Sequence, residues 1–223
     1  MSVNMKTSTE FEPTGQVDRE AEWLSLVEKY PELKTVELEV IDQSEVEDAT
    51  YTGGMLELDE SQEKVRVCIV DFDEKQYQRL IKHRQMSLSL MAEQIGIPVS
   101  DLSPQLLKRF IFLHEVGHAL NFERDYRHHP QIKGDYSLAY AVYDEDLERA
   151  LSDLPVPYWY PSELAAAIEQ QGEAAFMTAH PEIAAYARTH NLTARTLLAA
   201  QERAYKQTDH EQVADRFALA NLN

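Results

Sequence analysis

The chain has 223 residues, 43% of them hydrophobic, and a formal net charge of −18 at pH 7. This is enough apolar material for one sizeable folded domain. The negative charge argues against nucleic-acid binding, which needs a basic surface to neutralise phosphates. The single cysteine, Cys68, excludes an intrachain disulfide. No stretch approaches the roughly 18 apolar residues of a membrane helix, and residues 1–16 lack the hydrophobic core of a signal peptide, so we expect a cytoplasmic protein without a membrane partner.

The first part of the chain carries the strand patterns. Residues 1–16 are polar and predict a flexible tail, and we expect residues 17–223 to form a single domain. Alternating and β-branched residues then predict three strands, of which the second and third form a β-hairpin. The expected elements after the tail are a helix, these three strands and a long helix, at residues 18–29, 34–41, 51–58, 64–72 and 73–95.

A strongly apolar helix is predicted over residues 103–122. Ser103 followed by Pro104 is typical of a helix start, with a side-chain N-cap and a proline at the first helical position. The apolar stripe along this helix continues into His114 and His118, so we expect both histidines to face inwards.

The same helix contains the pentapeptide His-Glu-Val-Gly-His at residues 114–118, which matches H-E-x-x-H, the pattern of zinc peptidase helices. Residues four apart share a helix face, so His114 and His118 can both point a ring nitrogen at one zinc ion. Glu115 lies beside that face, where it can act as a general base on a water molecule without being a ligand. Gly117 would let a second backbone approach closely. The alternative is a core helix with two hydrogen-bonded histidines.

An aromatic-rich insertion is predicted at about residues 124–206. The part up to residue 161 holds six tyrosines and Trp159, any one of which could stabilise an oxyanion or belong to the core of an inserted subdomain. The proline-rich run at residues 154–161 predicts an extended arm that either lines or occludes a cleft. Alanine-rich helices are expected at residues 162–178, 181–190 and 193–206.

A second inward-facing helix is predicted near the C-terminus, with Thr208 or Asp209 as its N-cap. Glu211 and Asp215 are four residues apart on one of its faces. Two inward acids are costly unless they are paired or bind a metal. Glu211 would complete a set of two histidines and one glutamate, and Asp215 could accept a hydrogen bond from the distal ring nitrogen of a ligand histidine. The alternative is that both acids lie on a solvated face.

Together, the two motifs resemble the gluzincin pattern of zinc metallopeptidases, and residues 211–218 are similar to the short form found in the ImmA/IrrE family. The resemblance implies an antiparallel sheet before the His-Glu helix and a Zn²⁺ ion held by His114, His118 and Glu211. It also implies that Glu115 is the catalytic base and that the substrate is a specific regulatory protein.

Two features leave alternatives open. Glu211 follows His118 by 93 positions, which is longer than in compact members of that family. The rival third ligands are His180, His190, His210 and Asp209. The strand around residues 55–58 could pair with a substrate peptide, as edge strands of zincins do, or could be covered by the insertion.

We therefore predict an α+β fold, mainly helical and zincin-like, with a small antiparallel sheet. The predicted activity is zinc-dependent hydrolysis of a peptide bond, in which Glu115 takes a proton from water and passes it to the leaving amine. One alternative is a zinc-binding regulatory or interaction module without significant protease activity, and another is a metal-free helical scaffold. A cleft open along an edge strand would favour the peptidase, whereas an occluded cleft would favour the regulatory module.

Overall fold

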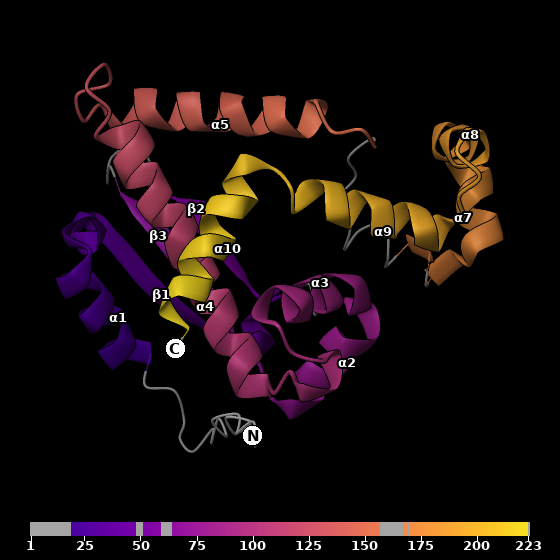
Figure 1. Cartoon of the computed structure of the whole chain (residues 1–223), viewed down its shortest axis with the longest axis horizontal. Helices are drawn as coiled ribbons and strands as arrows, with labels where there is room; N and C mark the ends of the chain where they lie inside the picture. Colours follow the sequence, from indigo (N-terminus) through magenta and orange to yellow (C-terminus); the bar gives the residue numbers. More distant parts are fainter. Residues whose placement is uncertain (1–18, 48–50, 59–63, 157–166, 169, 223) are drawn as a thin grey trace, which may run out of the picture.

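The computed structural model describes residues 19–47, 51–58, 64–156, 167–168 and 170–222 (Figure 1). The tail predicted at residues 1–16 lies outside this part of the chain. In chain order, the α-helices and strands are α1 (Arg19–Lys29), β1 (Val36–Asp42), β2 (Gly53–Glu57), β3 (Val65–Asp71), α2 (Glu74–His83), α3 (Gln85–Ile95), α4 (Pro104–Asn121), α5 (Tyr136–Ser152), α7 (Glu173–Ala179), α8 (Pro181–Thr189), α9 (Ala194–Tyr205) and α10 (Asp209–Asn221). A mainly helical α+β fold is therefore confirmed.

The strands form one three-stranded sheet in the order β1-β3-β2. β2 pairs antiparallel with β3, which confirms the predicted hairpin. β1 runs parallel to β3, with Val36 opposite Val65, so the sheet is mixed rather than wholly antiparallel. β3 takes the central place in the sheet because it is the most apolar strand, and its Val67 and Ile69 are at most 1% exposed. β1 and β2 consequently become the two edges.

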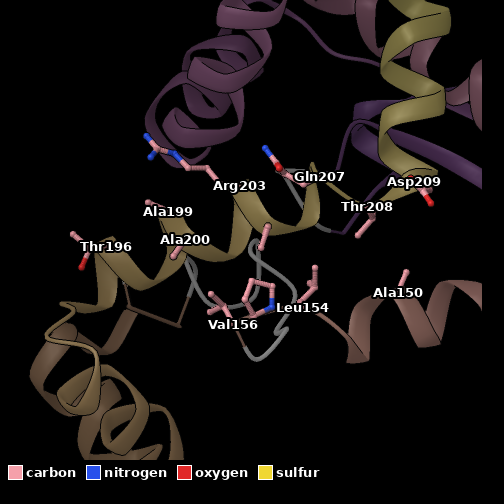
Figure 2. Close-up of a pocket in the computed structure, with 12 residues that line it drawn as sticks. Ala150, Leu154, Val156, Thr196, Ala199, Ala200, Arg203, Gln207, Thr208 and Asp209 are labelled. Atoms are coloured by element: carbon pink, nitrogen blue, oxygen red, sulfur yellow. The ribbon is translucent and has the colours of Figure 1, made fainter.

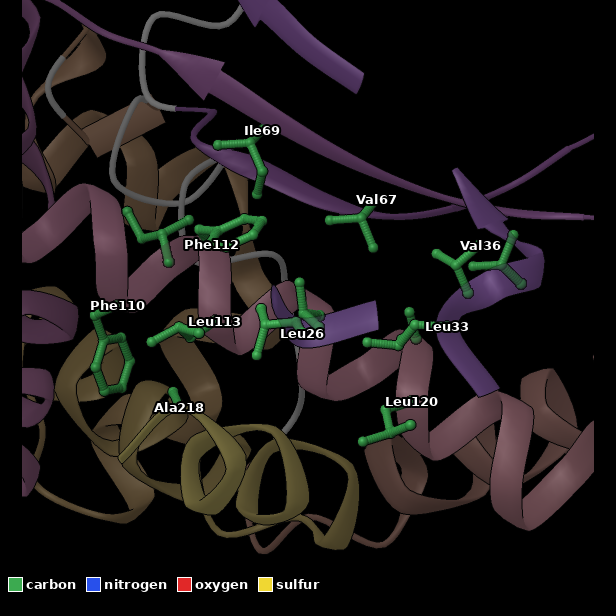
Figure 3. Close-up of a cluster of buried hydrophobic side chains, with 14 of the residues drawn as sticks. Leu26, Leu33, Val36, Val67, Ile69, Phe110, Phe112, Leu113, Leu120 and Ala218 are labelled. Atoms are coloured by element: carbon green, nitrogen blue, oxygen red, sulfur yellow. The ribbon is translucent and has the colours of Figure 1, made fainter. Parts of the chain in front are cut away.

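Helix α4 is the centre of the core. Its start is as predicted, because the Ser103 side chain accepts a hydrogen bond of 3.2 Å from the backbone N–H of Leu106. Figure 3 shows α4 between the sheet and α10, with Phe112 pointing towards Ile69 of β3 and Ala218 of α10 on the opposite side. Burial on two sides explains why this helix is apolar around most of its circumference.

Residues 73–95 form two helices instead of the single helix expected. α2 begins after Asp73, whose side chain accepts a hydrogen bond from the backbone N–H of Gln76. It ends at Arg84, where the backbone leaves the helical region with φ −118° and ψ 31°. The break lets both helices cover the core, because Leu80 of α2 and Leu88 of α3 are both buried. No glycine or proline marks this position in the sequence.

The predicted insertion is mostly helical where it is described. A π-helix (Phe122–Arg127) continues α4, and α5, which was not predicted, follows it. Tyr136 and Tyr143 of α5 pack on Phe122, with ring centroids 6.0 Å and 5.6 Å away. This half of the insertion therefore belongs to the main core.

Helices α7, α8 and α9 lie at the far end of the molecule from α1 (Figure 1). They bury a separate small cluster that includes Phe176, Ile183 and Leu197. α8 and α9 confirm two of the predicted alanine-rich helices, and the third is interrupted at Gly172. Most of the arm predicted at residues 154–161 lies outside the described residues. None of the described helices is both long and apolar enough to cross a bilayer.

Candidate metal centre

The candidate ligands come from two helices that cross at very short range, α4 and α10 (Figure 1). A Cβ atom added to Gly117 would lie 2.8 Å from the Cα atom of Ala214 and 3.0 Å from its carbonyl oxygen. No other residue type fits at position 117 without moving one backbone away from the other. The close backbone approach predicted at Gly117 is therefore observed, and its partner is the C-terminal helix.

Three side chains meet beside this crossing. The Nε2 atoms of His114 and His118 are 3.1 Å apart. The carboxylate oxygens of Glu211 lie 3.6 Å from Nε2 of His114 and 3.3 Å from Nε2 of His118. All three residues are buried, and their ligand atoms lie within 4.8 Å of one another. Two imidazole nitrogens and one carboxylate oxygen at these separations could hold one metal ion.

The second acid of α10 supports one of the two histidines. Asp215 Oδ1 lies 2.8 Å from Nδ1 of His114. Gln94 in α3 donates a 2.6 Å hydrogen bond from Nε2 to the other oxygen of Asp215. The contact between His114 and Asp215 lacks hydrogen-bond geometry, but a carboxylate at this distance favours the tautomer protonated at Nδ1, which would leave the Nε2 lone pair for a metal. Nδ1 of His118 has no protein hydrogen-bond partner among the described residues.

A lysine that sequence reasoning did not identify completes the cluster. Lys206 lies between α9 and α10, and its side chain is 17% exposed. Its Nζ atom lies 2.6 Å from Oε2 of Glu211 and 3.5 Å from Oδ1 of Asp215. The helix break at residues 206–208 separates it from α10, so no helical spacing in the sequence pointed to this contact.

The charges of the cluster stabilise one another. Burial raises the pKa of Glu211, but Lys206, His114 and His118 together outweigh it and hold this pKa well below its usual range. Burial also raises the pKa of Asp215, and the contacts with His114 and Lys206 lower it further than burial raises it. For His118, burial lowers the pKa, while Glu211 raises it and prevails. Both acids are therefore ionised at neutral pH, as metal binding requires.

A cleft of about 540 Å³ adjoins the three candidate ligands. One wall is the start of β2, residues 52–55, and no described strand pairs with the outer side of β2. Glu115 is half-buried and lines the cleft next to the two histidines. Apolar side chains of α2, α3 and α4 complete the lining, among them Leu80, Leu88, Met91, Leu107 and Phe110.

No protein-family model, no curated protein and no solved structure matches this chain. The likeness to gluzincin peptidases therefore stands on its two motifs alone. The functional argument accordingly depends on the geometry of the cluster and its cleft.

Two aromatic groups face the same cleft. Tyr143 and His210 both line it, and their rings meet edge to face with centroids 5.1 Å apart. Burial, with a further contribution from His118, lowers the pKa of His210, which keeps its ring neutral. Of the aromatic residues of the insertion that the structure describes, Tyr140, Tyr143 and Tyr205 line the cleft, whereas Tyr126 stacks behind His210.

Of the rival third ligands, His210 lines the same cleft but is not among the residues whose ligand atoms converge. The other three lie elsewhere. His180 packs on Phe176 and His190 stacks on Tyr186, both among the helices at the far end of the molecule. Asp209 lines a different hollow of about 910 Å³ between α9 and the end of α5 (Figure 2). That hollow contains none of the three clustered residues, so it is not the candidate site.

Proposed function

We propose that this protein is a zinc-dependent peptidase in which His114, His118 and Glu211 hold the metal ion. The observation that carries the proposal is the convergence of residues from two distant parts of the chain. The histidines and Glu211 are 93 or more positions apart in sequence, yet their ligand atoms lie within 4.8 Å. The donor set of two nitrogens and one carboxylate suits Zn²⁺, and three protein ligands leave a position for water or substrate.

Zinc bound here would polarise the scissile carbonyl and lower the pKa of a bound water. Glu115 is placed to accept the proton of the attacking water, because it lines the cleft directly beside both histidines. The protonated Glu115 can then deliver that proton to the leaving amine. Tyr143 offers an O–H group and His210 an N–H group on the same cleft, and either could stabilise the developing oxyanion.

The edge strand gives the cleft a way to hold a peptide. The outer side of β2 has backbone groups that no described strand uses, and residues 52–55 line the cleft. An extended peptide could add to this edge through backbone hydrogen bonds, which would bring one of its peptide bonds to Glu115. A cleft lined by an edge strand favours hydrolysis over a purely regulatory zinc module. A specific regulatory protein as the substrate rests on the resemblance to the ImmA/IrrE family.

The test compares wild-type protein with Glu115→Gln. Both are loaded with one equivalent of zinc and incubated with a mixture of unstructured peptides, and new termini are identified by mass spectrometry. We expect cleavage by the wild type, and a loss of roughly 10²–10⁴-fold in rate for the variant at equal zinc content. Equal cleavage by both proteins would contradict the role of Glu115. Zinc binding without cleavage by either would favour the regulatory module.

A further inference from the structure

The cluster contains two buried carboxylates. The side chains of Glu211 and Asp215 are 3% and 4% exposed. Buried carboxylates are unfavourable unless a cation or a metal compensates them. In the structure that cation is Lys206, which contacts both acids at once.

Lys206 contacts the oxygen of Glu211 that faces His114, whereas the other oxygen faces His118. Oε2 of Glu211 lies 2.6 Å from Nζ of Lys206 and 3.6 Å from Nε2 of His114. An ion held jointly by His114 and Glu211 would therefore compete with the ammonium group for Glu211. Two cations sharing one carboxylate oxygen repel each other, so the lysine and the metal oppose each other at this site.

We propose that Lys206 is a positioning residue whose ammonium group takes the place of the metal ion as the counter-ion of Glu211 and Asp215. In the metal-free protein its ammonium group holds Glu211 and Asp215 in the arrangement that the metal needs, and a divalent ion displaces it from Glu211. The contact with Asp215 gives the displaced ammonium a second acid to remain beside. The inference rests on the metal site of the proposed function but not on peptide hydrolysis.

This role has a consequence that a merely structural lysine would not have. Removing the charge of Lys206 leaves two unpaired acids in the metal-free protein and lowers its stability. The same change removes a competitor of the metal and strengthens zinc binding. The stability of the metal-free protein and its affinity for zinc should therefore change in opposite directions.

The experiment measures the melting temperature of chelator-treated protein with and without excess zinc chloride. The variants are Lys206→Met, Lys206→Gln and Lys206→Arg, with Lys108→Met as the matched control. Lys108 also pairs with an aspartate at 2.7 Å, but that aspartate, Asp71, is 56% exposed, so loss of the pair should change both quantities little.

We expect Lys206→Met to lower the melting temperature without zinc by roughly 6–20 °C. Zinc should bind about tenfold more tightly, which enlarges the zinc-induced rise by roughly 3–5 °C. Lys206→Arg should stay near the wild type in both measurements, and Lys206→Gln should fall between. A Lys206→Met protein that is unfolded without zinc and folds with it also supports the proposal.

An equal fall with and without zinc, in both the Met and Gln variants, would show a purely structural lysine and overturn the inference. So would unchanged melting temperatures. A wild-type protein whose melting temperature zinc does not raise would instead remove the metal site of the proposed function. The wild-type measurement thus separates the two failures.

Discussion

The Cα atom of Ala214 lies only 2.8 Å from the place that a Cβ atom on Gly117 would occupy. This contact between α4 and α10 fixes how far Glu211 stands from His114 and His118. Residue 117 sits inside the H-E-x-x-H motif, and Ala214 stands between Glu211 and Asp215 of α10. The crossing and the metal cluster are therefore one geometric unit.

Gly117→Ala should damage both stability and metal binding. Alanine favours the helix by about 1 kcal/mol, but overpacking against a backbone typically costs about 1–3 kcal/mol. The net cost is about 0–2 kcal/mol, so we expect a melting temperature lower by up to roughly 8 °C and a weaker zinc affinity, measured by competition with a chelator. Gln105→Ala, at an exposed position of α4, serves as the control. A Gly117→Ala protein with wild-type stability and affinity would show that the crossing does not set the ligand distances.

Asp215→Asn tests the support of His114. The change removes the carboxylate 2.8 Å from Nδ1 while keeping the side-chain size. Loss of such a partner typically weakens metal affinity by about 10–100-fold, so the variant should still bind zinc when zinc is in excess. Asp209→Asn removes one charge from the same helix at an exposed position and should leave the affinity unchanged. Equal losses in both variants would point to net charge instead of a specific contact.

The pH dependence of the metal-free protein should reveal the buried acids. The pKa of Glu211 lies well below its ordinary value of 4.5 in the folded chain, so the unfolded state binds more protons between the two values. The free energy of unfolding therefore rises with pH in this range. The contribution of Glu211 to it is fully present above about pH 5 and is lost as pH falls towards the folded pKa. Urea unfolding between pH 3 and 7 measures it. Glu211→Gln should reduce the loss of unfolding free energy at acidic pH. An unaltered loss would contradict the pairing of Glu211 with Lys206.

The sequence predicted the local parts of this fold well. Ser103 and Pro104 marked the start of α4, and the alternation in residues 51–72 gave the hairpin of β2 and β3. These signals are local, because caps, turns and periodicity act within a few residues. The meeting of Glu211 with the two histidines could also be proposed, since inward acids need a partner and two four-residue spacings offered one.

Other features depend on tertiary packing and left no local signal. The pairing of β1 with β3 depends on the central position of β3, which is decided by the whole core, and the parallel direction of β1 left no local signal. The break at Arg84 has no glycine or proline, and α5 was not predicted because its tyrosines were interpreted only as cleft or subdomain-core residues. Lys206 reaches Glu211 across the turn between two helices, so neither helical periodicity nor composition could place it.

The most direct test of the account is the zinc content per chain, measured by elemental analysis in the wild type, in Glu211→Ala and in His190→Ala. His190 stacks on Tyr186 away from the cluster and is the matched control. We predict about one zinc per chain in the wild type and in His190→Ala, and a clear loss in Glu211→Ala. Full zinc content in Glu211→Ala, or none in the wild type, would contradict the metal centre formed by His114, His118 and Glu211.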